Sequence, residues 1–172
     1  MKFKKEELHN EALISSIQKF GEEVNADTQR NLLDEVLKSR LWLPARVTPA
    51  PIKTPKGEYV VTSKHKVHMV SAHQTVKGQD TTYYIAFTDK DAYKTWANGK
   101  KHDIFTADFD EIAVMLLRPT AVCKGVIINP GTDNIRLTTE AVKQSIVHRD
   151  KVAAGEMEED AKDEGREEKT SL

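Results

Sequence analysis

The sequence has a single cysteine, Cys123, and no apolar run near the length of a membrane span. One cysteine cannot form an internal disulfide, which is typical of a reducing compartment, and a cysteine-based metal site is not expected. The longest apolar runs, 112–117 and 126–128, fall far short of the ~20 residues that cross a bilayer. The N-terminal segment lacks the apolar stretch of a signal peptide. These absences predict a cytoplasmic protein without membrane association.

The sequence also has no large excess of charge of either sign, since 26 basic and 27 acidic residues give a formal net charge of −1. The C-terminal segment 155–172 has eight acids and three bases, which leaves a charge of +4 on residues 1–154. This excess is smaller than the clustered basic footprint of nucleic-acid-binding proteins. No nucleic-acid partner is therefore predicted.

A length of 172 residues is typical of one globular domain with its own core. We predict one domain over residues 1–154. The acidic segment 155–172 is predicted to be a solvated tail, because it has too little apolar surface to offset the entropy of ordering it.

Helical periodicity appears early in the chain, over 10–21 and 27–39. Asn10 is the predicted cap of the first helix and Gly21 its stop. Two helices in succession predict a helical hairpin, which leads into a strand over 41–47. Three later helices are predicted to begin near 88–91, at the capping box 108–111, and at Thr138 or Thr139.

Strand patterns occupy much of the rest. Four prolines at positions 44, 49, 51 and 55 predict a surface connection. Strands are predicted at 59–62, 67–70 and 81–87, with the last two paired through a turn at 77–80. Tyr83, Ile85 and Phe87 share one strand face and are predicted to meet the helices. The fold class is therefore α+β, with a mainly antiparallel or mixed sheet, helices packed on one face and an N-terminal helical hairpin.

Residues capable of metal or covalent chemistry do not form a matched set. If His65, His68 and His73 lie on one strand, His65 and His73 share a face but are separated by roughly 26 Å. Cys123 precedes an apolar strand without a positioned base, which favours a packing role. No metal and no cofactor are predicted.

Three further groups of residues have both a structural and a functional interpretation. Asp108, Asp110 and Glu111 stand at a helix start, where capping explains them, although acids could also act in general acid/base catalysis. Trp96 fits a helical core position, while Trp42 could lie in the core or line a groove. In the segment Asn129–Asn134, Gly131 indicates a hairpin loop because glycine adopts the backbone angles of a tight turn. The amides and the carboxylate of this segment could also bind a ligand.

Four segments together resemble the SseB-type N-terminal domain, a bacterial family. They are Asn10–Ile17, Leu37–Pro44, Tyr83–Asp89 with Tyr93 and Trp96, and Gly125–Asn134. The resemblance covers residues 8–148, and the stretch Thr48–Lys66 departs from the simplest family pattern. It implies an α+β domain in the bacterial cytoplasm, with no catalytic residues that could be carried over to this chain.

The leading functional hypothesis is a non-enzymatic binding or accessory module for an unknown protein partner or a small polar ligand. Its predicted binding residues lie where two family-like strands end, and they are Phe87, Thr88, Asp89, Asn129, Pro130, Gly131, Asp133 and Asn134. One alternative is a small hydrolase or transferase that uses Asp89, Asp108 and Asp110. Another is an assembly protein, a homo-oligomer whose sheet edge pairs with a second chain.

Overall fold

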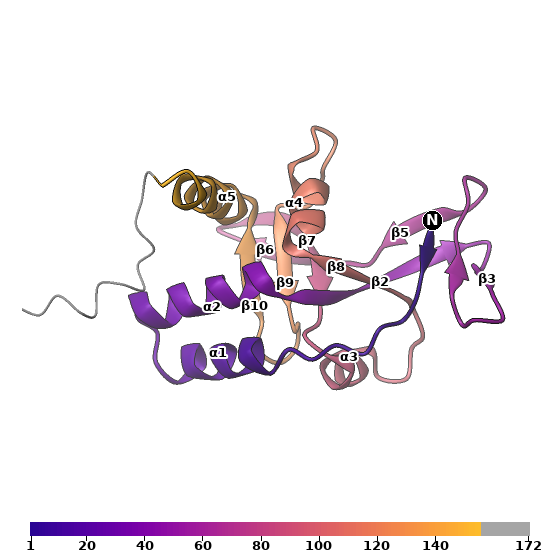
Figure 1. Ribbon diagram of the computed structural model, residues 1–172, viewed down its shortest axis with the longest axis horizontal. Helices are drawn as coiled ribbons and strands as arrows, with labels where there is room; N and C mark the ends of the chain where they lie inside the picture. The colour runs from indigo at the N-terminus through magenta and orange to yellow at the C-terminus, as the bar shows by residue number, and fades with distance from the viewer. Residues whose placement is uncertain (156–172) are drawn as a thin grey trace, which may run out of the picture. The chain divides into compact units, whose positions relative to one another are not determined.

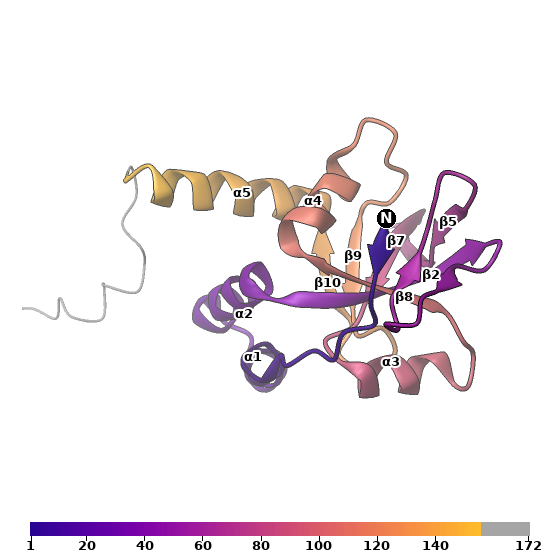
Figure 2. The same ribbon diagram turned by 45° about the vertical axis from the view of Figure 1, so that its right-hand side comes forward.

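The computed structural model describes residues 1–155 and divides into two compact units, Met1–Thr139 and a second that begins at Glu140 (Figures 1 and 2). The first unit holds all the strands and four of the helices. Residues 156–172, nearly all of the predicted acidic tail, lie outside the described part of the chain.

The element order confirms the predicted α+β class. The helices are α1 (Glu11–Glu22), α2 (Ala26–Lys38), α3 (Lys90–Ala97), α4 (Phe109–Leu117) and α5 (Thr139–Ala153). The strands are β1 (Lys2–Phe3), β2 (Arg40–Thr48), β3 (Ile52–Lys53), β4 (Tyr59–Val60), β5 (Lys66–Met69), β6 (Ser71–Val76), β7 (Gln79–Ala86), β8 (Asp103–Asp108), β9 (Gly125–Ile128) and β10 (Ile135–Thr138).

The strands form three sheets, in the orders β10-β9-β7-β6, β5-β2-β8 and β1-β4-β3. The first sheet is mixed, because β7 and β9 run parallel while its other pairs are antiparallel. An antiparallel bridge between Trp42 and Phe87 joins it to the second sheet. β5 and β6 are separated only by Val70, whose N–H donates to the Pro44 carbonyl at 2.9 Å. The two strands thus form one bent segment that pairs first with β2 and then with β7.

The pairing predicted for strand 81–87 is wrong in its partner. β7 pairs with β6, whereas 66–69 pairs with β2. The reason is the two-residue turn Lys77-Gly78, where both φ angles are positive, at 51° and 76°. Such a turn places Val76 opposite Gln79, so the residues next to the turn form the hairpin and the earlier strand lies beyond the bend.

The predicted helical hairpin is present as α1 and α2, which run side by side ahead of β2 (Figures 1 and 2). The cap predicted for α1 is right in its position but makes no side-chain cap bond, and the predicted stop is wrong. Asn10 is the N-cap residue, but its side-chain oxygen accepts no cap hydrogen bond, and its Nδ2 donates to the carbonyls of Arg40 and Thr88, at 2.8 and 2.7 Å, which fixes how the side chain is oriented. Gly21 lies inside α1, which continues to Glu22.

The later helix starts follow the expected chemistry. At α4 the Asp108 carboxylate accepts from the Glu111 N–H, and the Glu111 carboxylate accepts from the Asp108 N–H, each at 2.9 Å. This capping box satisfies two amide groups that a helix start leaves without intrahelical partners. At α3 the cap is Asp89, whose carboxylate accepts from the Ala92 N–H at 2.8 Å.

An aromatic core forms beneath α3. Phe87 is 0% exposed, Trp42 is 2% exposed, and Tyr93 packs edge-on against both rings. Ile85 and Phe87 meet α3, as the shared strand face predicted, and Trp96 packs partly buried against the same cluster. Trp42 is therefore a core residue, and its indole N–H donates to the Glu6 carbonyl at 2.8 Å.

None of the helices between residues 1 and 155 combines the length and apolar character required to span a bilayer.

Candidate functional site

The predicted binding residues gather where two parallel strands end. β7 and β9 are paired up to Ala86 and Ile128, so the residues that follow each strand lie next to one another. Thr88 leads from β7 into α3, and Asn129 begins the turn between β9 and β10.

A buried hydrogen-bond network ties these two strand ends together. Thr88 is 0% exposed and Asn129 is 3% exposed. The Thr88 N–H donates to Asn129 Oδ1, and Asn129 Nδ2 donates to Thr88 Oγ1, each at 3.0 Å. Asn129 Nδ2 also donates to Asp133 Oδ2 at 2.9 Å, and Thr88 Oγ1 donates to Asp89 Oδ2 at 2.7 Å. The network therefore runs from the α3 cap through the sheet edge to the turn.

The turn itself is a hairpin loop held by its own side chains. Asn129, Gly131 and Asn134 have φ angles of 51°, 84° and 49°. Asparagine tolerates this left-handed region better than most residues, and glycine has no Cβ to oppose it. Asn134 Oδ1 accepts from the Gly131 N–H at 2.9 Å, and its amide donates to the Thr132 carbonyl at 3.2 Å. The structural interpretation of these asparagines therefore has direct support.

Only some of the predicted binding residues are exposed. Phe87, Thr88, Asn129 and Pro130 are buried, and Asp89 is half-buried. The exposed members are Gly131, Asp133 and Asn134. Asp133 Oδ1 makes no hydrogen bond within residues 1–139, while Oδ2 is held by Asn129. A ligand at this edge would thus contact the exposed tip of a loop whose base is held by the Thr88–Asn129 hydrogen bonds.

The acids considered for catalysis have structural partners. Asp89 caps α3, and Asp108 caps α4. Asp108 Oδ2 also lies 3.7 Å from the Arg40 guanidinium. Both carboxylates thus accept backbone N–H groups at helix starts, which is the contact that a cap makes.

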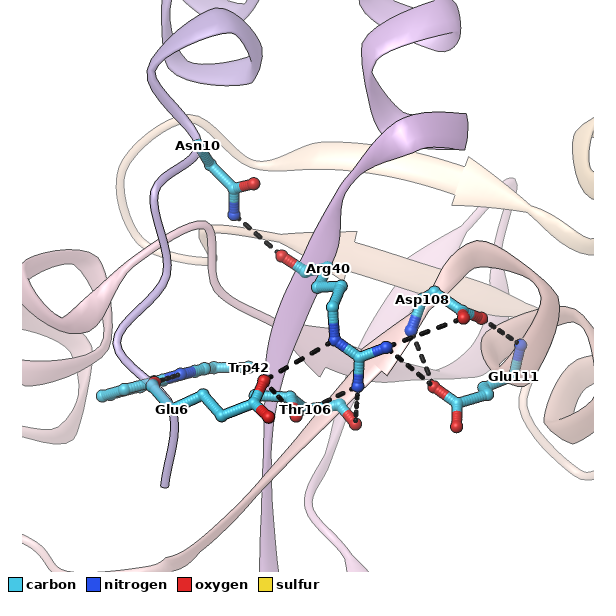
Figure 3. Close-up of polar contacts among 7 residues, drawn as sticks. All are labelled: Glu6, Asn10, Arg40, Trp42, Thr106, Asp108 and Glu111. Carbon is cyan, nitrogen blue, oxygen red and sulfur yellow. Dashed lines mark hydrogen bonds and ion pairs between the residues drawn. The ribbon is translucent and has the colours of Figure 1, made fainter. Parts of the chain in front are cut away.

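Arg40 was missed in the sequence, and it is the centre of a surface ion-pair network (Figure 3). Its guanidinium lies between Glu6 on one side, at 3.7 Å, and Asp108 and Glu111 on the other, at 3.7 and 3.9 Å. It also donates to Thr106 Oγ1 at 3.2 Å. The strand register opposes Arg40 to Asp108, so the contact depends on a pairing across 68 residues. Nothing in the local sequence signals that partner.

The three clustered histidines have separate surroundings. The His65 ring nitrogen Nδ1 accepts from the Thr62 N–H at 3.0 Å, and His73 Nδ1 lies 3.0 Å from Thr82 Oγ1. His68 stands on β5, opposite Arg46. Throughout residues 1–155, no three His, Cys, Asp or Glu side chains are grouped so that they could hold a metal ion.

Cys123 is buried, at 6% exposure, and lies beside Tyr84. Burial raises the pKa of its thiol, and the Tyr84 hydroxyl only partly opposes that shift. A protonated thiol is a poor nucleophile at neutral pH. The geometry therefore favours the packing role for Cys123.

A second surface feature lies at the far end of the β2–β8 ladder. A shallow depression of about 290 Å³, called here the basic depression, is lined by Ala45, Arg46, Val47, Lys101, His102 and Asp103. His102 Nδ1 lies 3.0 Å from the Tyr93 hydroxyl, which fixes the ring against α3. Burial, together with the charges of Arg46 and Lys100, lowers the pKa of the imidazole, and Asp103 opposes them weakly.

A proton NMR titration of His102 is expected to give a pKa below the ~6.5 of an exposed histidine. The substitution Arg46→Gln should move this pKa upward, because it removes one of the causes. Because the pKa of His102 is lower in the folded state, its contribution to stability is fully present at pH values above the unfolded-state pKa. That contribution is lost as the pH falls through the folded-state pKa. Assignment through His102→Gln would identify the resonance, and a pKa at or above ~6.5 would contradict the structure.

The fold and sites together define an α+β domain with a mixed sheet, a rigid polar turn and surface charge networks. The profile of the SseB protein N-terminal domain matches residues 13–144. The chain belongs to that family, as the four sequence segments indicated. Neither the curated proteins nor the solved structures gave a match. The matched range contains Arg40, Arg46, His102 and the 129–134 turn.

Proposed function

We propose that this SseB-type domain is a non-enzymatic binding module of the bacterial cytoplasm. It recognises a small polar ligand or a segment of a protein partner through the loop after β9. The observation that carries the proposal is the Thr88–Asn129 network, which fixes the base of an exposed polar loop.

Position in the sheet supports this assignment. Loops that follow adjacent parallel strands meet at one edge, which is where open α/β sheets bind ligands. β7 and β9 form such a pair, although the rest of the sheet is antiparallel. A loop held in one conformation also loses little entropy when it binds.

Chemistry at the tip indicates what the ligand presents. The Asp133 carboxylate accepts one hydrogen bond from Asn129 and keeps Oδ1 available on an exposed side chain. A carboxylate accepts hydrogen bonds and attracts positive charge. The ligand is therefore expected to offer an amino or hydroxyl group.

The non-enzymatic part of the proposal follows from the acids. Asp89 and Asp108 are engaged as helix caps, and Asp108 also faces Arg40. Both carboxylates have hydrogen-bond donors that would compete with a substrate proton.

A thermal-shift panel with amino acids including serine, nucleotides, phosphosugars and divalent metals tests the proposal. At 100 times its dissociation constant a ligand stabilises the fold by about 2.7 kcal/mol, or about 5–10 °C for a chain of this size. The expected result is a shift with one class of compound that Asp133→Ala abolishes. Asp133 is preferred to Asn134 for this test, because Asn134 holds the turn.

Asp80→Ala is the matched control. Asp80 is also exposed and also accepts one side-chain hydrogen bond, from Thr75 at 3.0 Å, but it lies at the start of β7 rather than beyond its end. The proposal fails if Asp80→Ala and Asp133→Ala reduce the shift equally. A flat panel would reject a small ligand and leave a protein partner, to be sought by affinity purification with wild type and Asp133→Ala side by side.

A further inference from the structure

The basic depression owes its shape to the end of a strand ladder. β2 and β8 are paired from Arg40↔Asp108 to Ala45↔Asp103, and the pairing stops there. The next N–H of β2 on that side, from Val47, donates to Asp103 Oδ2 at 3.0 Å instead of to a backbone carbonyl. The Asp103 side chain thus takes the place of the next hydrogen bond between β2 and β8. The residues that precede Asp103 in the chain lie outside the sheet.

This arrangement turns the one carboxylate of the lining toward the backbone. Asp103 is half-buried and its Oδ2 accepts the Val47 N–H. The cations around the depression, Arg46, Lys100 and Lys101, are exposed. With Asp103 counted, the group has an excess of two positive charges before His102 is considered.

The contrast with Arg40 shows that the cations are unusual. Arg40 and Arg46 lie on the same face of β2, six residues apart, because strand side chains alternate. Arg40 has three carboxylates within 4 Å. Within residues 1–139 the side chains of Arg46, Lys100 and Lys101 form no hydrogen bond or ion pair. One face of β2 therefore has an arginine with carboxylate partners at one end, Arg40, and an arginine without an ion pair at the other, Arg46.

His102 adds an oriented nitrogen to this cluster. Its Nδ1 is engaged with the Tyr93 hydroxyl, and its ring packs against Trp96 with centroids 5.3 Å apart. Nε2 has no hydrogen-bond partner in the unit that ends at Thr139. The lowered pKa of the imidazole is consistent with the positive field of Arg46 and Lys100.

We propose that the basic depression binds the phosphoryl group of a small phosphorylated compound, at a site separate from the 129–134 loop. Arg46 supplies a planar fork of donors that matches phosphate oxygens, Lys101 supplies a point charge, and the His102 ring supplies a directed hydrogen bond in the tautomer that carries its proton on Nε2. The excess of two positive charges fits a phosphate monoester, whose charge is about −1.5 to −2 at pH 7. A volume of about 290 Å³ lies at the small end of ligand pockets, so the bound compound is small.

Titration of ¹⁵N-labelled protein with inorganic phosphate and with glycerol 3-phosphate, at constant ionic strength, tests this site. The amide signals of residues 45–47 and 101–103 are expected to shift and saturate together. Arg46→Gln should weaken binding about tenfold or more, since a charged hydrogen bond contributes about 1.5–3 kcal/mol. Arg46→Lys should recover only part of the loss, because lysine lacks the fork.

Matched variants separate a built site from general charge attraction. Lys101→Gln should weaken binding, while Lys64→Gln, which removes the same charge from an exposed lysine outside the depression, should leave it unchanged. Asp133→Ala should also leave phosphate binding unchanged, so this site and the proposed loop site can fail independently. Spectra that match wild type away from the substitution would verify folding.

Three results of the phosphate titrations would overturn the inference. They are shifts that do not saturate, shifts centred elsewhere than on residues 45–47 and 101–103, or equal losses from Lys64→Gln and Lys101→Gln. Acetate at the same ionic strength should bind more weakly than phosphate, and equal binding of acetate would exclude a site for a dianion.

Discussion

Replacing Phe87 with alanine is expected to lower the free energy of unfolding by about 3–5 kcal/mol, the usual loss for a large aromatic core residue. Phe87 is 0% exposed and its ring lies 5.5 Å from Tyr93 and 5.3 Å from Trp96, between centroids. Truncation would remove these contacts and leave a cavity that the strands around it cannot easily close.

The position of Phe87 in the backbone makes relaxation harder. Its N–H donates to the Trp42 carbonyl at 2.8 Å, and its carbonyl accepts from the Trp42 N–H at 2.9 Å. This bridge joins the β10-β9-β7-β6 and β5-β2-β8 sheets. A shift of the backbone to fill the cavity would therefore strain the connection between two sheets.

Urea denaturation followed by far-UV circular dichroism measures the effect. Phe87→Leu keeps most of the apolar volume and is expected to cost less than the alanine variant, by more than 1 kcal/mol. Val122→Ala is the exposed control, since Val122 is 75% exposed and its truncation should change stability by less than about 0.5 kcal/mol. A loss below about 1.5 kcal/mol for Phe87→Ala would contradict the assigned core.

The predicted features that the structure confirms are those whose chemistry is local. The capping box at 108–111 needs only residues three apart, and the strand-turn-strand over 125–138 needs only a turn of Asn and Gly between apolar runs. In each case the partners are close in the chain, so spacing alone fixes the contact. The family resemblance drew on the same local segments.

Features that depend on distant partners could not be predicted. The sequence marks Asn10 as a helix cap, but its Nδ2 donates to two carbonyls 30 and 78 residues away, and these bonds orient the side chain without a cap bond. The strand 67–70 has the composition of a hairpin partner for β7, yet the turn at Lys77-Gly78 assigns that place to β6. Tertiary geometry overrides local preference at both positions.

The candidate sites divide in the same way. The loop 129–134 was found because its residue types are typical of an exposed turn. The basic depression was not, since Arg40 and Arg46 look equivalent in the sequence and differ in the residues that the fold brings beside them, which for Arg40 are Glu6, Asp108 and Glu111. The net charge of the whole chain does not show which cations have carboxylates beside them.

Replacing Asn129 with alanine is expected to lower the free energy of unfolding by about 3 kcal/mol. The Thr88 N–H would lose its acceptor in a buried position, which costs about 1–3 kcal/mol. Alanine at a φ of 51° would add about 1–2 kcal/mol, because its Cβ disfavours the left-handed region. The two costs arise from different parts of the same residue and can be separated by substitution.

Asn129→Gly removes the hydrogen bonds but fits the positive φ, so it should be more stable than Asn129→Ala by about 1 kcal/mol. Asn129→Asp retains an acceptor for the Thr88 N–H but loses the donors to Thr88 Oγ1 and Asp133, and it places a buried carboxylate against the Asp133 carboxylate, so it should be no more stable than the alanine variant at neutral pH. A double-mutant cycle with Thr88→Val, by urea denaturation, should give a coupling of about 0.5–3 kcal/mol. Coupling near zero would show that the Thr88 hydroxyl adds nothing to the anchor, whose backbone bond to Asn129 Oδ1 the valine variant keeps. Equal stability of the glycine, aspartate and alanine variants with wild type would show that the loop is not anchored through Asn129 and would remove the support for a preorganised binding surface.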